Sequence, residues 1–416
     1  MTKYYTSPRW TAELPDCSMP MTFDTYSNCG FGCVYCFASY QRAIGHDARK
    51  DAYLSGDSNA INVERTKRIF TDPDFSQFGP YTAARKTLQW GGMSDPFCTI
   101  EKEKEVGLEM LRFFAEIDYP ICFSTKGVWW LRDERYTELF KGRKNWNVKI
   151  SIITMNKEKA RRVEVGCPTP KRRLEALEKI AKLDCGGATL RLRPFMLGIT
   201  NPTHVPLIKE AGERGASAVS TEFFCLERRS PALRKHMPML EEVSGFDYME
   251  LYAKYSRGAG YLRLNRNIKR EFVNEMEVAA REAGMRFYVS DAHFKERCDN
   301  GSCCGLDESW NYSRGQFCEA LVLCKKNGQV TWSEIEPDMI VAGLDKILWR
   351  QAENYNTGSA RARAKFHKHS LRDYLRWLWN NPKAGQSPYT MFQGIMKPTS
   401  KDEDGNLIYE YDATRG

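Results

Sequence analysis

The loop that decides the fold reads Asn28-Cys29-Gly30-Phe31-Gly32-Cys33-Val34-Tyr35-Cys36, with three cysteines at C-x3-C-x2-C spacing. Three closely spaced thiolates can occupy three corners of a four-iron, four-sulfur (4Fe-4S) cluster, and the two glycines let the backbone wrap round it. One iron then has no protein ligand, so a small molecule with an amine and a carboxylate can chelate it. A structural zinc site needs four ligands and a ferredoxin-type cluster needs a fourth cysteine, and the loop supplies neither.

Outward from this loop, short β-rich runs alternate with longer helical patterns. Strands are predicted over 21–26, 87–90, 121–125, 148–153, 189–195, 216–223 and 286–290. Apolar residues at three- and four-residue spacing predict helices over 101–117, 170–183, 205–214 and 268–283. Such alternation favours a parallel sheet with right-handed crossovers. We therefore expect an α/β protein built on a partial, TIM-like (β/α)6-type barrel, with a Cys-rich C-terminal extension and C-terminal helices.

The chain divides by composition into four segments. These are an N-terminal extension (1–20), the barrel (21–290), a Cys-rich auxiliary metal or cluster region (291–335), and C-terminal helices with a polar tail (336–416). Within the third segment, 321–324 and 330–332 predict a hairpin around a turn at 326–328. Helices are expected over 338–353 and 359–379, and the tail from Lys401 is expected to be mobile.

Composition narrows the class of protein. The 416 residues are 42% hydrophobic, which is enough for a sizeable core, and no stretch is long and apolar enough for a membrane helix. The N-terminus opens no signal-peptide pattern, so the protein is expected to be cytoplasmic with no membrane partner. In that compartment, 14 cysteines are more often metal ligands or catalytic groups than disulfides.

The cysteine triplet, with Tyr35 before its last cysteine, resembles the signature of the radical S-adenosylmethionine (SAM) superfamily. After the second strand, Gly91-Gly92-Met93-Ser94-Asp95-Pro96-Phe97 is similar to the glycine pair that holds the methionine amino group of SAM in that superfamily, although Met93 replaces the usual acid. The strings at later strand ends resemble the spore photoproduct lyase subgroup over about residues 20 to 225. They are Thr125-Lys126-Gly127, Ser151, Thr154, Arg191-Leu192-Arg193-Pro194 and Leu197-Gly198-Ile199-Thr200-Asn201.

The resemblance implies a set of cofactor contacts. Cys29, Cys33 and Cys36 would hold the 4Fe-4S cluster, Ser151 and Arg193 would contact the ribose or carboxylate of SAM, and Gly198 with Ile199 would lie near the adenine. The full set expected to bind SAM is Tyr35, Gly91, Gly92, Ser94, Asp95, Lys126, Ser151, Arg193 and Gly198. The subgroup also uses a hydrogen-donating cysteine outside the cluster. Cys98 is the nearest candidate, with an ordinary buried thiol as the alternative.

A second group of cysteines lies in the C-terminal half, at Cys298, Cys303, Cys304, Cys318 and Cys324. The first four could bind an auxiliary iron–sulfur cluster or a structural zinc ion, with Cys324 facing the hairpin, and the absence of any metal is a third possibility. The lyase subgroup lacks such a tail, which puts the inherited reaction in doubt.

The expected function is reductive cleavage of SAM to a 5′-deoxyadenosyl radical that abstracts hydrogen from a substrate, with flavodoxin or ferredoxin as reductant. A nucleobase or modified pyrimidine in DNA is favoured, for repair or base modification. The grounds are the resemblance to the lyase subgroup, the basic run over 361–376 followed by aromatics at Tyr374, Trp377 and Trp379, and the net charge of +9. Glu222 and residues 227–229 are candidate substrate contacts. Two alternatives are radical modification of a peptide or amino acid, and a non-catalytic, metal-stapled nucleic-acid-binding protein. The class of reaction stays open among lyase, isomerase and transferase.

Overall fold

The structure, a computed structural model, describes residues 4–11, 13–42, 58–257, 261–352 and 360–415. The first residues of the predicted extension (1–3) and the ends of two predicted helices (353 and 359) lie outside the described residues. No helix in the described ranges is both long enough and apolar enough to cross a membrane.

A mostly parallel sheet organises the barrel. Among the described residues it has eight strands in the order β1-β2-β3-β4-β5-β6-β7-β11, in which only β1 is antiparallel to its neighbour. The strands are β1 (Arg9–Trp10), β2 (Met21–Phe23), β3 (Leu88–Trp90), β4 (Ile121–Thr125), β5 (Trp146–Ser151), β6 (Ala188–Phe195), β7 (Ala218–Phe223) and β11 (Arg286–Val289). All seven predicted strands are confirmed, with shifts at their ends.

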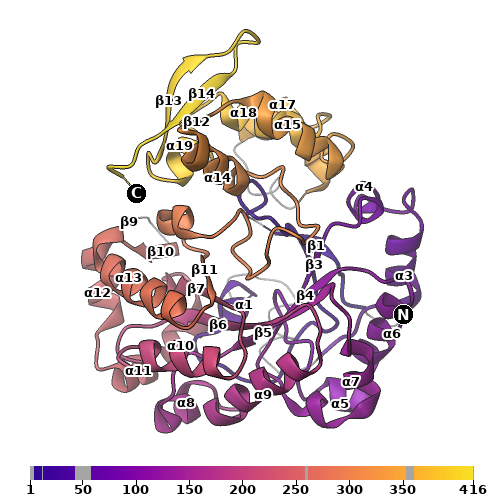
Figure 1. Ribbon diagram of the computed structural model, residues 1–416, viewed down its shortest axis with the longest axis vertical. Coiled ribbons are helices and arrows are strands. Elements are labelled where there is room, and N and C mark those ends of the chain that lie inside the picture. The colour runs from indigo at the N-terminus through magenta and orange to yellow at the C-terminus, as the bar shows by residue number, and fades with distance from the viewer. Residues whose placement is uncertain (1–3, 12, 43–57, 258–260, 353–359, 416) are drawn as a thin grey trace.

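Helices connect these strands and ring them on the outside (Figure 1). They are α1 (Phe37–Arg42), α3 (Val63–Thr71), α4 (Gly79–Ala83), α5 (Glu101–Lys104), α6 (Val106–Glu116), η1 (Trp129–Arg132), α7 (Glu134–Phe140), α8 (Lys157–Val163), α9 (Pro170–Lys182), α10 (His204–Glu213) and α13 (Arg266–Glu282). Strand and helix therefore alternate as the sequence predicted, and the α/β fold class is confirmed.

The helix predicted over 101–117 is two helices, because the chain turns sharply between α5 and α6. Glu105 adopts a left-handed conformation with φ of 51°. The buried carboxylate of Glu101 accepts the backbone N–H groups of Gly107 and Leu108, each at 2.7 Å, and so caps the start of α6. The Glu101 side chain thus bonds to backbone N–H groups at the start of α6 that have no partner within the helix. A new helix therefore begins at a point where the apolar periodicity alone predicts one continuous helix.

Both faces of the sheet are buried, but they differ in character. In β5, Trp146, Val148 and Ile150 are apolar, and the Trp146 ring contacts Phe140 of α7 with centroids 4.9 Å apart. The intervening Asn147, Lys149 and Ser151 are also buried and point to the opposite, inner face. The apolar face therefore packs against the helices, and the inner face is polar.

The barrel is open on one side. No hydrogen-bonded ladder joins β1 to β11 in the described part of the chain. The N-terminal segment crosses this region beside the Cys-rich segment: the Pro15 carbonyl accepts the N–H of Phe317 at 2.8 Å, and the Ser18 carbonyl accepts that of Ser313 at 2.9 Å. The sheet is thus the partial barrel that the sequence predicted.

An insertion follows β7 and precedes α13. It contains a small antiparallel sheet in the order β8-β10-β9 and two helices. The elements are β8 (Cys225–Glu227), α11 (Pro231–Ser244), α12 (Tyr248–Tyr255), β9 (Ser256–Arg257) and β10 (Tyr261–Leu264). The sequence analysis did not predict these strands, because they are too short for a clear alternation of apolar and polar residues.

A C-terminal unit of helices and a three-stranded sheet, coloured orange to yellow in Figure 1, lies at one end of the molecule. After the short η2 (Ala292–Arg297), its elements are α14 (Phe317–Asn327), β12 (Gln329–Val330), α15 (Trp332–Val341), η3 (Trp349–Gln351), α17 (Ala360–Phe366), α18 (Leu371–Trp379), α19 (Pro388–Met391), β13 (Met396–Lys401) and β14 (Leu407–Tyr411).

Several predictions for this unit were wrong. The helix expected over 338–353 starts earlier and ends at Val341, and the one expected over 359–379 is divided into α17 and α18. Residues 321–324 belong to α14, whose buried Phe317, Ala320, Leu321 and Cys324 have helical spacing, so there is no hairpin. The tail after Lys401 is not a mobile segment, because β14 pairs with both β12 and β13 and its Tyr409 is fully buried. Pairing with a strand far earlier in the chain orders a sequence whose composition is that of a polar tail.

The basic and aromatic residues of 361–379 separate onto different sides. Tyr374 and Trp379 are buried, and Tyr374 stacks on Trp349 with centroids 4.5 Å apart. The cations at Arg361, Lys365, Lys368 and Arg376 are exposed. These two aromatic rings belong to the core and are not available for stacking on bases, whereas Trp377 is half-buried and stacks on Tyr374 with centroids 5.9 Å apart.

Candidate active site

The candidate site lies where the parallel strands end. Because carboxyl ends of parallel strands meet at one edge of the sheet, the loops after β2, β3 and β4 lie beside the last residues of β5, β6 and β7. The cysteine loop follows β2, the glycine loop follows β3, and Lys126 follows β4. Ser151, Arg193 and Glu222 stand at or near the ends of the next three strands, so the fold brings the predicted residues to one edge.

The cysteine loop has the conformation that a cluster needs. Gly30 and Gly32 adopt left-handed φ values of 67° and 62°, and the Cys29 N–H is held by Asn28 Oδ1 at 2.8 Å. Burial raises the pKa of the Cys29 thiol, and so do the nearby thiols of Cys36 and Cys33. The three thiols therefore converge, and binding metal would release their protons.

The convergence suits a cluster better than a single ion. Among the described residues, no three Cys, His, Asp or Glu side chains lie close enough to hold one ion. Ligands of one zinc ion all lie about 2.3 Å from it, whereas the ligands of a cubane bind different irons and stand farther apart. The residues present thus fit a 4Fe-4S cluster with one iron left without a protein ligand.

A fourth thiol that the sequence analysis did not predict lies beside the triplet. Cys167 Sγ is 3.5 Å from Cys33 Sγ, and this hydrogen bond, together with burial, raises the pKa of Cys33. Cys167 follows α8, far from the triplet in the chain, so no local spacing could reveal it. It lies within reach of a sulfur that would bind iron.

Tyr35 anchors the loop to a buried ion pair. Its hydroxyl donates to Glu164, which forms a salt bridge with Arg173, and both partners are 1% exposed. Burial opposes ionisation of Glu164, but Arg173 outweighs it and lowers the pKa of the carboxyl. Arg173 Nη1 also donates to the Ser151 carbonyl at 2.7 Å. The network therefore joins the cysteine loop to the end of β5.

Lys126 lies over the ring of Tyr35, with Nζ 5.6 Å from the centroid. Burial would lower the pKa of its ammonium group, but Cys33, Glu164 and Cys167 raise it above the ordinary value. A fixed positive charge is thus held beside the cysteine loop, where it would stabilise thiolates and the negative charge of an iron–sulfur cluster.

The glycine loop is held by two carboxylates. Asp24 Oδ1 accepts the N–H groups of Met93 at 2.8 Å and Ser94 at 3.0 Å. Gly91 has a φ of 98°, and a side chain there would lie 2.4 Å from the Ser124 carbonyl, so only glycine fits. A Cβ at Gly92 would lie 3.0 Å from the Arg9 guanidinium. The Ser94 hydroxyl is buried with no hydrogen-bond partner in the described chain, so it can donate to or accept from a bound group, and its contact with SAM stays a prediction.

Asp95 joins the glycine loop to the next strand. It accepts the Thr125 hydroxyl and the Lys126 N–H, each at 2.6 Å, and the Phe97 N–H at 2.9 Å. Burial raises the pKa of this carboxyl despite these three donors. Both carboxylate oxygens of Asp95 accept hydrogen bonds from the protein itself. Asp95 therefore positions the glycine loop against the loop after β4.

The structure pairs the predicted ribose-contacting residues differently from the sequence analysis. Ser151 Oγ accepts from Arg191 Nη1 at 3.3 Å, whereas Arg193 forms a salt bridge with Glu222 and donates to Ser290 Oγ at 3.3 Å. Residues two apart on a strand share a face, so both arginines point inward from β6. The site therefore contains two arginines and one carboxylate, with Glu222 placed at this edge as predicted.

Gly198 lies in the loop after β6. It has a φ of 74°, and a Cβ there would meet the Ser244 carbonyl at 2.0 Å. Its N–H donates to Asn201 Oδ1 at 2.7 Å, and its carbonyl accepts the Lys159 ammonium. These contacts with its own loop, α8 and α11 account for the glycine, and its role as an adenine contact stays a prediction.

Two thiols near the site differ in exposure. Cys98 is fully buried and packs with Tyr26 and Phe31 beneath the cysteine loop, and burial raises its pKa to about 12. Cys225, at the start of β8, is half-buried; burial and the neighbouring Glu222 raise its pKa to about 12, and its thiol donates to the Phe223 carbonyl at 3.6 Å. The sequence analysis named Cys98 because it adjoins the glycine loop and missed Cys225, which has no local pattern.

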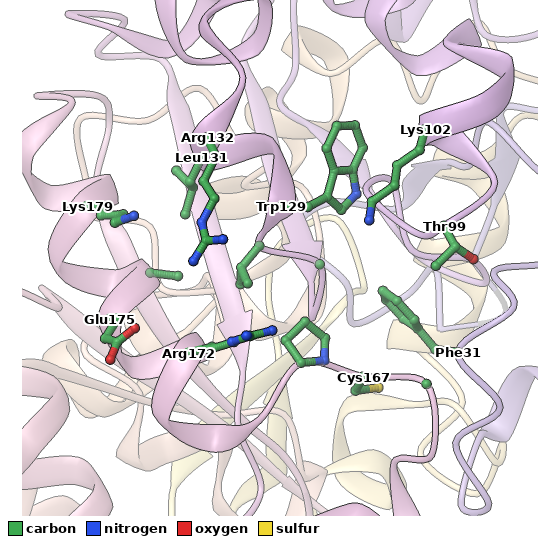
Figure 2. Close-up of a pocket in the computed structure, with 15 residues that line it drawn as sticks. Phe31, Thr99, Lys102, Trp129, Leu131, Arg132, Cys167, Arg172, Glu175 and Lys179 are labelled. Atoms are coloured by element: carbon green, nitrogen blue, oxygen red, sulfur yellow. The ribbon is translucent and has the colours of Figure 1, made fainter.

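A cleft of about 350 Å³ opens beside the cysteine loop (Figure 2). Phe31, Gly166 and Cys167 form the wall shared with the loop. The remaining wall is basic, with four cations and one acid: Lys102, Arg132, Arg172, Lys179 and Glu175. The cleft thus suits a negatively charged partner close to Cys33.

The second cysteine group is split. Cys298 Sγ accepts the Val289 N–H at 3.2 Å, and the carbonyl of Cys303 accepts the Ser220 hydroxyl at 2.8 Å. Cys318 is buried in the first turn of α14. Cys304 instead packs against Cys122 and its apolar neighbours, and Cys324 is bonded to the Tyr409 carbonyl at 3.5 Å. The Cys304 thiol also bonds to that of Cys303, which lowers the pKa of Cys304 to about 7, so Cys304 stays beside Cys303, whereas Cys324 faces β14.

No family model matches the chain, and no curated protein matches its sequence. Among solved structures, spore photoproduct lyase complexed with dinucleoside spore photoproduct is 16% identical over 69% of this chain and 80% of that chain, with a TM-score of 0.49. A mutant of that lyase with bound AdoMet and dinucleoside spore photoproduct is 17% identical, covers 66% and 77%, and has a TM-score of 0.47. Streptococcus suis SuiB bound to precursor peptide SuiA is 13% identical, covers 67% and 51%, and has a TM-score of 0.40. These are distant likenesses to radical SAM enzymes.

The buried ion pair makes a stability prediction. Arg173→Met should lower the free energy of unfolding by about 3–5 kcal/mol, because it leaves Glu164 charged, buried and unpaired. Arg172→Met, at the exposed neighbouring position on α9, should change it by no more than about 0.5 kcal/mol. Denaturant unfolding followed by circular dichroism measures both. Equal, small effects at the two positions would contradict the role given to the pair.

Proposed function

We propose that this chain is a radical SAM enzyme that acts on a nucleobase. The observation that carries the enzyme class is the meeting, at one barrel edge, of three convergent thiols, a fixed cation at Lys126 and a buried, unpartnered hydroxyl at Ser94. Three thiolates leave one iron free for a chelating cofactor, and the loops beside it carry the polar groups to hold that cofactor.

When bound, the cluster and SAM supply one-electron cleavage of SAM and a radical able to take hydrogen from an unactivated carbon. The chain's own residues position and shield this chemistry. Asp24 and Asp95 hold the glycine loop, and Tyr35 with Lys126 fixes the cysteine loop. Ser94 Oγ and the Ser151–Arg191 pair present polar groups to SAM, with Gly91, Gly92 and Gly198 as backbone contacts. Ordered loops of this kind exclude water from the reacting atoms.

A nucleobase is favoured by the groups beyond the SAM contacts. Arg193 and Glu222 form a charged pair at the strand ends, and Arg263 of β10 influences the same carboxylate. Such donors and acceptors can hydrogen-bond to the edges of a base or its phosphates. The exposed cations of 361–376 offer a separate basic surface for a nucleic-acid backbone.

A hydrogen donor outside the cluster has two candidates. Cys98 is fully buried beneath the cysteine loop, so a substrate radical could reach it only after a rearrangement. Cys225 is half-buried, its thiol donates to the Phe223 carbonyl at 3.6 Å, and burial together with Glu222 raises its pKa, so it stands among the proposed substrate contacts. We therefore add Cys225 to Cys98 as a proposed donor and favour it on exposure.

The electron donor is proposed to dock over the basic cleft. Arg132 and Lys179 are exposed at its rim, and Cys167 connects its wall to Cys33. A flavodoxin or ferredoxin that presents acidic side chains would complement these charges and bring its cofactor close to the cluster. The cleft shares Phe31 and Gly127 with the cysteine loop and the loop after β4, whereas the proposed substrate contacts Arg193 and Glu222 are not among its lining residues.

The cluster ligands make the first prediction of this proposal. Cys29→Ala, Cys33→Ala or Cys36→Ala should each reduce SAM cleavage to background, measured as 5′-deoxyadenosine after anaerobic reconstitution. Cys167→Ala should retain SAM cleavage but shift the cluster's reduction potential to a more negative value, because one hydrogen bond to a ligand sulfur is lost. Cleavage that survives any of the three alanines would overturn the enzyme class.

The substrate class is tested with deuterium. Oligonucleotides deuterated at the 5-substituent of a pyrimidine should transfer deuterium to 5′-deoxyadenosine, and deuterated peptides should not. Glu222→Gln should reduce this transfer about tenfold or more while uncoupled SAM cleavage continues, because it removes a proposed substrate contact. Transfer from peptides alone would favour the peptide or amino-acid reading. Salt-dependent DNA binding without SAM cleavage would favour a non-catalytic binder.

The docking surface is tested by charge reversal. The double variant Arg132→Glu/Lys179→Glu should slow reduction by flavodoxin about tenfold or more at low salt, because steering of an acidic partner is lost. Lys171→Glu, also exposed on α9 but outside the cleft, is the matched control. Reduction by dithionite should be unchanged in all three proteins. An equal loss in the control would assign the effect to net charge instead of to the cleft.

A further inference from the structure

The small sheet of the insertion, β8-β10-β9, has two different faces. In the antiparallel pair of β8 and β10, Leu226 stands opposite Leu262, and both are buried in the core. Side chains alternate between the faces along a strand, and residues directly opposite each other in an antiparallel pair point the same way. The other face therefore carries Cys225 opposite Arg263, with Tyr261 two positions away on β10. We call these three residues the insertion face.

The insertion face brings three different groups to the surface. Tyr261 is 37% exposed, the Arg263 side chain is 40% exposed, and Cys225 is half-buried. The Arg263 guanidinium lies over the Tyr261 ring, 5.5 Å from its centroid. Side chains directly opposite each other in an antiparallel pair have Cβ atoms about 5 Å apart, so the thiol lies next to the guanidinium. An aromatic ring, a cation and a thiol thus share one accessible surface.

The insertion face continues the barrel edge that carries the proposed substrate contacts. Glu222 belongs to β7, three positions before Cys225, and forms a salt bridge with Arg193 of β6. Burial raises the pKa of Glu222, and the charges of Arg193 and Arg263 oppose this effect. The Arg263 guanidinium therefore acts on the same carboxylate from the side of the insertion. A molecule held by Arg263 would thus lie beside the pair of Arg193 and Glu222.

A carboxylate of the protein already occupies Arg263. Glu13 Oε1 of the N-terminal segment accepts a hydrogen bond from Arg263 Nη2 at 3.0 Å, although the two residues are 250 positions apart in the chain. The Glu13 side chain is 52% exposed, and an exposed ion pair of this kind contributes no more than about 1 kcal/mol. A phosphate can accept two parallel N–H groups of a guanidinium, which is a stronger arrangement. An incoming phosphate can therefore displace Glu13 from Arg263.

Release of Glu13 would not disturb the rest of the N-terminal segment. The Glu13 carbonyl accepts the N–H groups of Asp16 at 3.0 Å and Cys17 at 2.9 Å, and Asp16 forms an ion pair with the buried Lys295 at 2.8 Å. These contacts use the backbone of Glu13 and a neighbouring side chain, and none of them uses the Glu13 carboxylate. The carboxylate is thus able to leave Arg263 while the chain around it stays in place.

We infer that the insertion face binds one nucleotide of the substrate. Arg263 would bond to the phosphate, the Tyr261 ring would stack on the base, and Glu13 would occupy Arg263 when no substrate is bound. A nucleotide carries a flat ring and an anion on one unit, which matches this face, whereas an acidic side chain of a peptide carries only the anion. The inference rests on the proposed function, because it states how a nucleic-acid substrate would be held beside Cys225 and Glu222.

The test measures binding without catalysis. Full-length, anaerobically reconstituted protein is titrated into a short fluorescein-labelled oligothymidylate at low salt with SAM omitted, and fluorescence anisotropy gives the dissociation constant. Arg263→Gln should weaken binding about tenfold or more, because charge-assisted hydrogen bonds to phosphate are lost. Arg270→Gln, which removes an exposed arginine from α13, is the matched control and should weaken it by less than about twofold. An uncharged methylphosphonate version of the probe should bind wild-type protein and Arg263→Gln equally.

The aromatic ring and the internal carboxylate are tested with the same probe. Tyr261→Leu should weaken binding about fivefold or more through loss of stacking, and Tyr261→Phe should retain it. Glu13→Gln should tighten binding about threefold, because it removes the competitor for Arg263, and should have no effect when Arg263→Gln is already present. Glu64→Gln, at an 83% exposed carboxylate of another ion pair, is the matched control and should leave binding unchanged.

Four results would overturn the inference. They are no measurable binding of the probe, equal weakening by Arg263→Gln and Arg270→Gln, undiminished binding by Tyr261→Leu, and tightening by Glu13→Gln that persists without Arg263. Far-UV circular dichroism checks folding. If Arg263→Gln does not fold, Arg263→Lys repeats the test and should lose part of the binding, since an ammonium group cannot bond to phosphate through two parallel N–H groups. Failure of the proposed function looks different: the probe would bind in an Arg263-dependent manner, yet the protein would not cleave SAM.

Discussion

The site depends on a buried ion pair between Glu164 and Arg173. Arg173 is long enough to reach both that carboxylate and the end of β5, and Glu164 accepts the hydroxyl of Tyr35 from the cysteine loop. Two charges removed from water are stable only while they remain paired and hydrogen-bonded. The cysteine loop, which has little regular structure of its own, is therefore fixed by the same contact that orders α9 against the sheet.

The barrel interior extends this constraint. Its inner face carries polar residues that satisfy one another: Lys149 donates to Gln89 at 2.6 Å, and Gln89 donates to Ser124 at 3.1 Å. A buried polar network is stable only when each member has a hydrogen-bond partner. Substituting one of these residues would therefore leave its partner unpaired. The apolar outer face of the sheet packs against the helices. The polar inner face can therefore bind charged ligands at the strand ends.

The sequence predicted what local patterns encode. Strand and helix alternation and the spacing of the cysteine loop needed only neighbouring residues, and the structure agrees with the alternation. Contacts between distant segments were missed, such as Cys167 beside Cys33 and the ion pair of Asp16 with Lys295. The wrong prediction of a hairpin had a local cause. The apolar residues of 317–324 have helical spacing, but the glycine turn that follows them was interpreted as the turn of a hairpin.

The N-terminal segment has a consequence for how the molecule assembles. It seals the open side of the barrel by bonding to residues 313 and 317, which are synthesised long after it. Until then Met19 lacks part of its cover, because it packs against Leu306, Trp310 and Tyr312 as well as Cys122. Closure of the barrel is therefore a late folding event, since the contacts that complete it join segments far apart in the chain.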